Sequence, residues 1–446
     1  MEINNNSDIN NIKNIDSKIN ININNNKNEN KNENNNNNNI EINNEKIKED
    51  QDSILMKPPP IFITPANKYD TITLIHRGHI ISIPRKLTIN TKSITDCGPD
   101  GVMFRAYNND SKEDVIIKKI SVLLLKNDKT ARKLLRNLVF QRHFHEHPLI
   151  SGFRSVFKKK SSENYLITNR NNRNNVRLPL LQQKSDDDIY FEYVLPEYTL
   201  AQMTHNKLLN NQNTMIFLYQ LLTIIKFIHS AGVIHRDIDP CTITIDQNFC
   251  LKLTEFNFCF ATNCPTDLFF NDYDTSSYIY RAPETIWRDS IYSTAIDVWN
   301  IGVIFGGMIL GRQLFKNQDY DDHLTSISKL IGNPTNEDLS NVKSKSIHQY
   351  MQNLPKSTLT PSIGIKKRFR GASKDQIELL EGMLCWDQRK RMTIDQLLSH
   401  KYFESIHEES MQIQCSQIFN LKYYSEFYMM KPDIVKKTIE NEFITP

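Results

Sequence analysis

The amino-acid sequence predicts an α+β fold of two lobes, a small one built mostly of antiparallel β-strands with one main helix and a larger one built of helices. Strand-like segments dominate up to about residue 195, and helical periodicity dominates after about residue 200. The short stretch 194–198 between the two regions is the predicted hinge. A chain of 446 residues is long enough for one domain of this kind and a separate head.

The first part of the chain, residues 1–53, is dominated by Asn, Ile, Lys and Glu. Such a tract buries too little apolar surface to offset its chain entropy, so we expect it to be disordered. We interpret it as a tolerated repeat; a self-associating tract that drives assembly is the alternative. A second Asn- and Lys-rich stretch, 158–186, interrupts strand-like sequence and indicates a loop insertion at the surface.

Within the small lobe, residues 64–196, the elements can be predicted in order. The segments 102–107 and 114–120 predict a hairpin, because Asn and Asp residues that favour turns separate them. Apolar residues at helical spacing predict the main helix of this lobe over 130–143. The segment 189–195 predicts a further strand.

The larger lobe, residues 197–403, shows helical periodicity in three long segments, at 215–231, 295–310 and 374–385. A C-terminal extension, 404–446, follows it. Strands first and helices afterwards are the order that indicates the α+β class.

The composition excludes several classes of function. A net charge of +4 on a chain of 446 residues gives no reason to expect a nucleic-acid partner. The seven cysteines are scattered without a CxxC pair, which indicates reduced thiols and neither a zinc site nor a disulfide framework. Because there is no apolar run of about eighteen residues and no signal peptide, we expect no membrane partner and a cytoplasmic protein, with the nucleus as the other compartment.

Four motifs follow one another in a recognisable order. Val-Ile-His-Arg-Asp contains Arg236 and ends at Asp237, and Tyr-Arg-Ala-Pro-Glu ends at Glu284. Asp-Val-Trp-Asn-Ile-Gly begins at Asp297, and a single arginine, Arg391, comes later. In protein kinases, similar motifs form the catalytic loop, the end of the activation segment, the helix that anchors the catalytic loop and the arginine that pairs with the second motif. The resemblance implies structural roles for Arg236, Glu284, Asp297 and Arg391.

Three further stretches indicate the branch of this family. Residues 332–339 and 350–355 resemble the insert of mitogen-activated protein (MAP) kinases, and residues 418–446 resemble the extension that returns to the small lobe. Over residues 64–446 the chain therefore resembles a MAP kinase of the CMGC group whose catalytic motifs are degenerate. The resemblance implies the bilobal fold of a serine/threonine protein kinase.

Phosphoryl transfer depends on positioned charges, so each position that binds nucleotide in the family can be checked in turn. The resemblance places the phosphate-binding loop at Gly98 and Gly101 and the phosphate-binding lysine at Lys118. Asp96 adds a negative charge beside this loop, and Pro99 removes a backbone N–H from it. We therefore expect a damaged nucleotide site.

Three substitutions surround this lysine and the hinge. Asn137 stands where the family has the glutamate that pairs with Lys118, and an amide orients an ammonium less well. Gln141 stands one helical turn later at a normally apolar position, so we expect it to loosen the packing between the lobes. Pro196, which has no N–H, stands where a backbone N–H normally meets adenine, unless the alignment slips by one residue.

In the catalytic loop, the resemblance makes Asp237 the general base. Asp239 replaces the lysine that touches the transferred phosphate, and Thr242 replaces the asparagine that ligates the second metal ion. Glu255 and Asn257 replace the aspartate and glycine of Asp-Phe-Gly. Because magnesium demands near-octahedral geometry, we expect Glu255 to be a weak metal ligand.

Counting back from Arg-Ala-Pro-Glu places Asp272, Tyr273 and Asp274 at the Thr-x-Tyr switch of MAP kinases. Both switch positions are acidic. We interpret them as part of a solvated acidic loop; the alternative is a built-in, incomplete mimic of the phosphorylated state.

The sequence after residue 403 resembles a docking patch that binds basic peptides in the family. Glu404, Glu408 and Glu409 remain, whereas Met411 and Gln412 replace expected acids. The sequence predicts a weakened docking surface for basic peptides; exposed acids without a partner are the alternative.

Together, the altered positions predict a catalytically inactive kinase (a pseudokinase) of MAP kinase type. We expect a monomer that binds protein partners, among them components of MAP kinase pathways, and no cofactor beyond weakly bound ATP and Mg²⁺. The alternative is a slow serine/threonine kinase that transfers the γ-phosphate of ATP with Asp237 as the base and Glu255 as the metal ligand.

Overall fold

The protein divides into two units, Met1–Lys57 and Pro58–Pro446. The predicted head, 1–53, lies outside the described residues, and only residue 158 of the predicted insertion 158–186 lies within them. The structure is a computed structural model that describes residues 71–76, 79–84, 86–96, 101–120, 127–158, 188–262, 278–287, 292–316, 319–355, 357, 359–407, 412–419 and 431–443.

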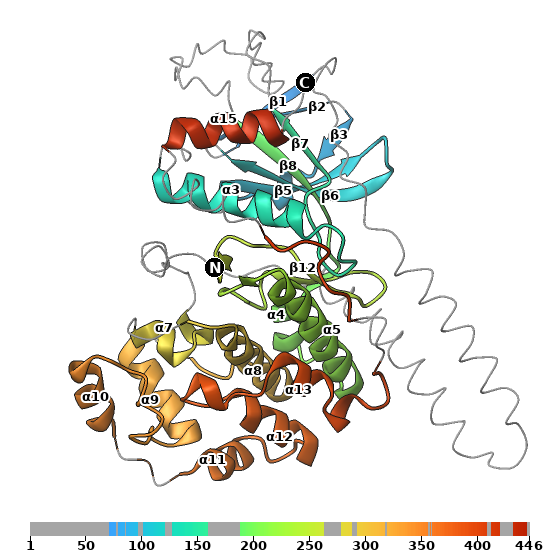
Figure 1. The fold of residues 1–446 in the computed structure, drawn as a ribbon. Helices are drawn as coiled ribbons and strands as arrows, with labels where there is room; N and C mark the ends of the chain where they lie inside the picture. The colour runs from blue at the N-terminus through green and yellow to red at the C-terminus, as the bar shows by residue number, and fades with distance from the viewer. Residues whose placement is uncertain are drawn as a thin grey trace, which may run out of the picture. The chain divides into compact units, whose positions relative to one another are not determined.

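The small lobe contains a six-stranded antiparallel sheet in the order β3-β5-β6-β8-β7, with β4 paired to β5 (Figure 1). The predicted hairpin and the predicted strand before the hinge are confirmed as β5, β6 and β8. A separate two-stranded hairpin, β1-β2, precedes the sheet. The strands are β1 (Thr71–His76), β2 (His79–Pro84), β3 (Leu87–Ile89), β4 (Thr95–Asp96), β5 (Val102–Asn108), β6 (Glu113–Ile120), β7 (Ser155–Lys158) and β8 (Ile189–Val194).

The predicted main helix of the small lobe is α3 (Asp128–His143). It begins where the side chain of Asn127 accepts hydrogen bonds from two backbone N–H groups of its first turn. The C-terminal helix α15 (Pro432–Phe443) packs against α3, and the Arg142 guanidinium lies 4.6 Å from the centre of the Phe443 ring. The predicted C-terminal extension therefore does return to the small lobe.

The large lobe is helical, and α8 is buried along most of its length. The three predicted helices are confirmed as α5, α8 and α12; α5 begins four residues earlier than predicted because Asn210 caps its first turn. Among the helices of the described residues, none combines the length and the apolarity needed to cross a bilayer. The helices of this lobe are α4 (Leu200–His205), α5 (Asn211–Ser230), α7 (Pro283–Trp287), α8 (Ala295–Leu310), α9 (Tyr320–Ile331), α10 (Lys345–Gln352), α11 (Pro361–Arg368), α12 (Lys374–Met383) and α13 (Ile394–Leu398).

The large lobe also contains short strands, which lie around the catalytic-loop motif. One small sheet has the order β12-β11-β9, and a second pairs β10 with β13. The strands are β9 (Tyr198–Thr199), β10 (Val233–Ile234), β11 (Ile243–Ile245), β12 (Leu251–Leu253) and β13 (Phe260–Ala261).

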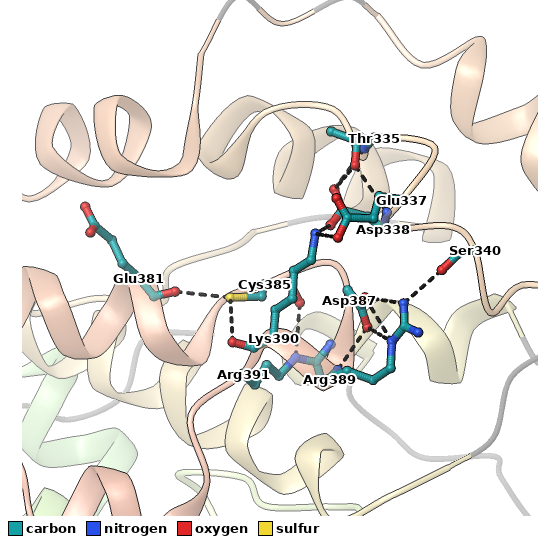
Figure 2. A network of polar contacts seen from close by, with 10 residues as sticks. All are labelled: Thr335, Glu337, Asp338, Ser340, Glu381, Cys385, Asp387, Arg389, Lys390 and Arg391. Atoms are coloured by element: carbon teal, nitrogen blue, oxygen red, sulfur yellow. Dashed lines mark hydrogen bonds and ion pairs between the residues drawn. The ribbon is translucent and has the colours of Figure 1, made fainter.

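The predicted insert after α9 is tied to the turn that follows α12. Figure 2 shows the Lys390 ammonium between two carboxylates, 3.3 Å from Glu337 Oε1 and 2.9 Å from Asp338 Oδ1. The neighbouring Arg389 donates a hydrogen bond from Nη2 to Ser340 Oγ at 2.8 Å. These exposed contacts fix the path of the insert, although each pair contributes little free energy.

A buried ion pair joins α7 to the same turn. Arg391 donates from Nη1 to Glu284 Oε1 at 2.6 Å and from Nη2 to Glu284 Oε2 at 2.7 Å. The same guanidinium donates to the backbone carbonyl oxygens of Ala295 and Cys385. All four of these hydrogen bonds are made to groups of the protein. The ion pair therefore connects α7, the start of α8 and the turn that follows α12.

Replacing Arg391 with alanine should lower the free energy of unfolding by about 3–5 kcal/mol, because it leaves the buried Glu284 carboxylate without a partner. Urea unfolding followed by circular dichroism measures this change. The adjacent, half-exposed Lys390 provides the control, since Lys390→Ala removes only ion pairs at the surface and should lower the free energy of unfolding far less. Equal losses in the two variants would contradict this account of the pair.

Candidate functional site

The catalytic-loop motif is held by a carboxylate at the start of α8. Asp297 is fully buried, and its two oxygens accept hydrogen bonds from the backbone N–H groups of His235 and Arg236, both at 2.8 Å. The φ angle of Arg236 is 69°, in the left-handed region that residues with a Cβ rarely adopt. The carboxylate therefore stabilises a strained turn directly before Asp237.

The loop that follows Asp237 is closed by its own hydrogen bonds. Asp239 Oδ1 accepts from the backbone N–H of Cys241 at 2.7 Å, and Thr242 Oγ1 donates to the carbonyl oxygen of Asp239 at 3.0 Å. Thr254 Oγ1 in turn donates to the carbonyl oxygen of Thr242 at 2.7 Å. The hydroxyl that replaces the metal-binding amide of the family is thus used to close this loop.

Two neighbouring side chains of α3 hold the backbone of the triplet 255–257. Asn137 Oδ1 accepts a hydrogen bond from the backbone N–H of Phe256 at 2.8 Å. Arg136 donates from Nη1 to the carbonyl oxygen of Asn257, also at 2.8 Å. Both side chains are buried. The amide of Asn137, expected beside Lys118, therefore bonds the backbone of the altered Asp-Phe-Gly motif.

Gln141 extends this contact by one helical turn. Its Nε2 donates to the carbonyl oxygen of Thr254 at 2.7 Å and to Asn137 Oδ1 at 3.1 Å, and its Oε1 accepts from the backbone N–H of Phe153 at 3.3 Å. Our expectation that Gln141 loosens the packing is wrong, because the buried amide bonds polar groups of both lobes. We call this contact the α3 clamp, formed by Arg136, Asn137 and Gln141 on the backbone of residues 254–257.

Lys118, on β6, pairs with the glutamate that replaces the metal-binding aspartate. Its Nζ lies 3.5 Å from Glu255 Oε1, and Asn257 Nδ2 donates to Glu255 Oε2 at 2.9 Å. Both carboxylate oxygens thus already contact protein donors, one of them a cation. A magnesium ion bound to Glu255 would have to displace the amide and overcome the charge of the ammonium.

Acidic neighbours change the titration of the predicted base. Burial, and after it the negative charges of Asp239 and Glu255, raise the pKa of Asp237 to about 7, although Arg281 and Lys133 act in the opposite direction. Close to neutral pH, about half of the Asp237 carboxyl groups therefore carry a proton. The carboxyl groups of Asp237, Asp239 and Glu255 thus lie close together, in the part of the site where active kinases have positive charge to neutralise phosphate.

The two ends of the predicted phosphate-binding loop are described, whereas residues 97–100, which include Gly98, are not. Asp96 is the last residue of β4. Gly101 has a φ angle of 95°, and a Cβ at this position would lie 2.0 Å from the carbonyl oxygen of Lys119. Only glycine fits there, so the backbone conformation explains the presence of Gly101 without any role in binding nucleotide.

The hinge begins directly after β8. The register pairs Lys118 with Phe191 across β6 and β8, and Pro196 follows two residues after the end of β8. The next backbone N–H, that of Glu197, donates to the carbonyl oxygen of Ile245 at 3.0 Å. This part of the hinge therefore offers adenine no N–H group.

The residues of this site do not fit magnesium and ATP together. Glu255 is engaged by Lys118 and Asn257, and Asp239 brings a repelling charge where a phosphate would lie.

The acidic switch triplet, Asp272, Tyr273 and Asp274, lies outside the described residues. Arg236, the residue that such a mimic would need as a partner, is 1% exposed and lies against Phe260 at 5.0 Å from the ring centre. The mimic hypothesis therefore stays a prediction.

The predicted docking patch is described only in part, because Glu408, Glu409 and Met411 lie outside the described residues. Glu404 is exposed. Gln412 Oε1 accepts a hydrogen bond from the ammonium of Lys226 at 2.9 Å. Lys226 is itself paired with Asp395 Oδ1 at 2.6 Å, so this contact adds no net negative charge that would attract a basic peptide.

Replacing Gln141 with leucine, the apolar kind of residue that the family resemblance leads one to expect, should lower the free energy of unfolding by about 1–3 kcal/mol. The reason is that the buried carbonyl oxygen of Thr254 and N–H of Phe153 lose their partner. Urea unfolding measures this. Gln212→Leu, at an exposed position of α5, is the matched control. A stabilised Gln141→Leu variant would contradict the α3 clamp.

The raised pKa of Asp237 makes a prediction about pH. The unfolded chain releases this proton near its ordinary pKa of 3.8, whereas the folded chain keeps it up to about 7, so folding loses stability as the pH rises between these values. Asp237→Asn should remove this loss. Its advantage over the parent in the free energy of unfolding should therefore grow by on the order of 2 kcal/mol from about pH 5 to pH 8. Melting curves across this range measure the difference.

A second variant identifies the cause of that shift. In Asp239→Asn, one of the negative charges beside Asp237 is gone, so the fall in stability should finish at a lower pH than in the parent. If the pH profiles of the parent, Asp237→Asn and Asp239→Asn coincide, the Asp237 carboxyl does not titrate as described.

Comparison with known proteins gives the same family. The protein kinase domain model matches residues 97–403. A Dictyostelium discoideum protein named as a probable serine/threonine-protein kinase kinase is 79% identical, over 90% of this chain and 87% of its own length. Another from this organism, named as a probable inactive serine/threonine-protein kinase, is 41% identical, over 88% of this chain and 97% of its own length.

A more distant relative indicates the branch. Mitogen-activated protein kinase 6 of Oryza sativa subsp. japonica is 31% identical, over 73% of this chain and 79% of its own length. The motifs around Asp237, Glu284 and Asp297 could be recognised in the sequence by their residues and their order. No sequence signal, however, pointed to Arg136 in the α3 clamp. The chain belongs to the protein kinase family, in its MAP kinase branch.

Proposed function

We propose that this chain is a catalytically inactive kinase of MAP kinase type, which acts in signalling by binding protein partners. The single observation that carries the proposal is the contact of Glu255 with Lys118 and Asn257. A lysine that neutralises the protein's own glutamate is less available for phosphate, and that glutamate is less available for magnesium. The two groups that phosphoryl transfer needs most thus satisfy each other.

The α3 clamp supports the same proposal. In an active kinase, the lysine on the strand and a glutamate on the helix must pair for catalysis. Here Asn137 and Gln141 bond the backbone of residues 254–257 instead. Contacts between neutral amides and the backbone need neither a nucleotide nor a metal ion, so the lobes can be held together without them. A relative that is 41% identical is itself named as probably an inactive kinase.

A slow serine/threonine kinase is the second candidate, and one observation favours it. A pKa of about 7 at Asp237 is the value at which a general base works best near neutral pH. The relative that is 79% identical carries the name of a kinase kinase. In this candidate, Asp237 takes the proton of the substrate hydroxyl group.

The partners proposed here are proteins, and components of MAP kinase pathways are the first group to test. Gln412 is neutral, and Lys226 beside it is paired with Asp395, so these side chains do not supply the negative charge with which the acidic patch of the family attracts basic peptides. We therefore look for the partner-binding surface elsewhere on the large lobe.

Thermal unfolding with ATP separates the two candidates. A ligand that binds only the folded state at about a hundred times its dissociation constant adds about 2.7 kcal/mol of stability, which a melting curve detects easily. The inactive form should show no increase in melting temperature with ATP and magnesium together. A clear increase that requires magnesium would contradict the proposal and favour the slow kinase.

A repaired variant is the matched control for this experiment. It restores the family's residues at four positions and keeps the rest of the chain, with the substitutions Asp239→Lys, Thr242→Asn, Glu255→Asp and Asn257→Gly. This variant should gain a magnesium-dependent increase in melting temperature, which shows that the assay can detect binding in this fold.

A further inference from the structure

A groove in the large lobe lies between α9, α11 and the segment 312–316 that follows α8. It encloses about 490 Å³. None of the described residues that line it is acidic. The cationic side chains of its lining are Arg312, Lys316, Lys329, Lys367 and Arg368.

Close packing of two helices brings these charges together. A Cβ at Gly364, on α11, would lie 1.8 Å from the carbonyl oxygen of Leu330 on α9, so only glycine allows this approach. The last turns of both helices consequently end at the groove. Lys329 comes from α9, and Lys367 and Arg368 come from α11.

The usual explanation for such residues covers only part of the cluster. Basic side chains are common in the last turn of a helix, because they offset the negative end of its dipole. That reason applies to Lys329, Lys367 and Arg368. It reaches Arg312, which directly follows Gly311 at the end of α8, but it does not apply to Lys316, five residues beyond Gly311.

Two exposed lysines elsewhere in this lobe are paired with carboxylates, unlike the cations of the groove. Lys374 pairs with Glu378 and Lys401 pairs with Asp375, so those lysines are neutralised locally. Among the described residues, no carboxylate forms a salt bridge with any cation of the groove. Burial, and after it the positive charge of Arg312, lowers the pKa of Arg368, as expected for two guanidinium groups without an anion between them.

The hydrogen bonding of Arg368 leaves room for a ligand. Its Nη2 donates to the carbonyl oxygen of Leu314 at 3.5 Å, which positions the guanidinium at the wall of the groove. The fork of an arginine carries five N–H donors and suits carboxylate or phosphate groups. Leu359, which is half-buried, adds apolar surface to the lining.

We propose that this groove binds an acidic peptide segment of a partner protein, in which carboxylates or phosphorylated serines flank an apolar side chain. The inference builds on the binding role proposed above and specifies the chemistry of the partner. The cations would hold the anionic groups, and Leu359 would contact the apolar side chain. A groove of this volume suits a short segment rather than a folded domain.

The lining favours a peptide over a nucleic acid. Single-stranded nucleic acids stack their bases on accessible aromatic rings. Phe315 is the aromatic residue among those that line the groove, and it is 4% exposed. It therefore cannot provide a stacking surface.

Fluorescence anisotropy on the full chain tests the proposal. The probe is a fluorescein-labelled peptide with the core Asp-Glu-Leu-Asp-Glu, and the comparison is the same peptide with the neutral core Asn-Gln-Leu-Asn-Gln. We expect binding of the acidic peptide only, weakened by added salt. Removing three cations should weaken it at least about tenfold. The variant carries Lys329→Gln, Lys367→Gln and Arg368→Gln.

A matched variant removes the same charge from elsewhere in the large lobe. All three of its positions are exposed, and its peptide affinity should equal that of the parent. Melting curves confirm that both triple variants are folded. The control substitutions are Lys343→Gln, Lys345→Gln and Lys374→Gln.

Three results would overturn the proposal. These are equal binding of the neutral peptide, equal loss of affinity in the two triple variants, and tighter binding of oligouridylate or phosphatidylserine vesicles through the same cations. A phosphoserine version of the peptide, bound more tightly than the carboxylate version, would identify phosphate as the source of the charge. The assay contains no nucleotide, so its failure would leave the proposal on catalysis standing.

Discussion

The α3 clamp is the contact on which the rest of the site depends. Arg136, Asn137 and Gln141 bond the backbone of residues 254–257, so the segment that follows β12 is fixed against the small lobe. Two of these three side chains are neutral amides, which avoid most of the desolvation cost of burying a charge. Because the segment is fixed in this way, Glu255 is held within reach of Lys118, and the two opposite charges lie 3.5 Å apart.

The distribution of charge over the large lobe is consistent with a change of role. Acidic side chains gather around Asp237, where a kinase needs positive charge to stabilise phosphate. Positive charge gathers instead between α9 and α11, far along the chain from the catalytic motifs. The insert beside α9 is anchored by Lys390 and Arg389. The acidic groups around Asp237 and the cations of the groove both support the proposal that this chain recognises proteins and does no chemistry on nucleotides.

Much of the fold could be predicted from the sequence, because the hairpin of β5 and β6 and the helices α3, α5, α8 and α12 follow regular apolar spacing. The altered site positions could also be located, since they keep fixed distances from the motifs. The role of Gln141 could not be predicted, because its partners Phe153 and Thr254 are 12 and 113 residues away in the sequence. The groove was missed for the same reason: its cations come from three separate segments.

The central claim is that the pocket cannot stabilise a migrating phosphoryl group. The most direct test is transfer of labelled γ-phosphate from ATP to a generic protein substrate, measured for the purified chain and for Asp237→Asn under the same conditions. The two proteins should give the same background signal. Transfer by the parent chain at an ordinary kinase rate, abolished in Asp237→Asn, would contradict the central claim.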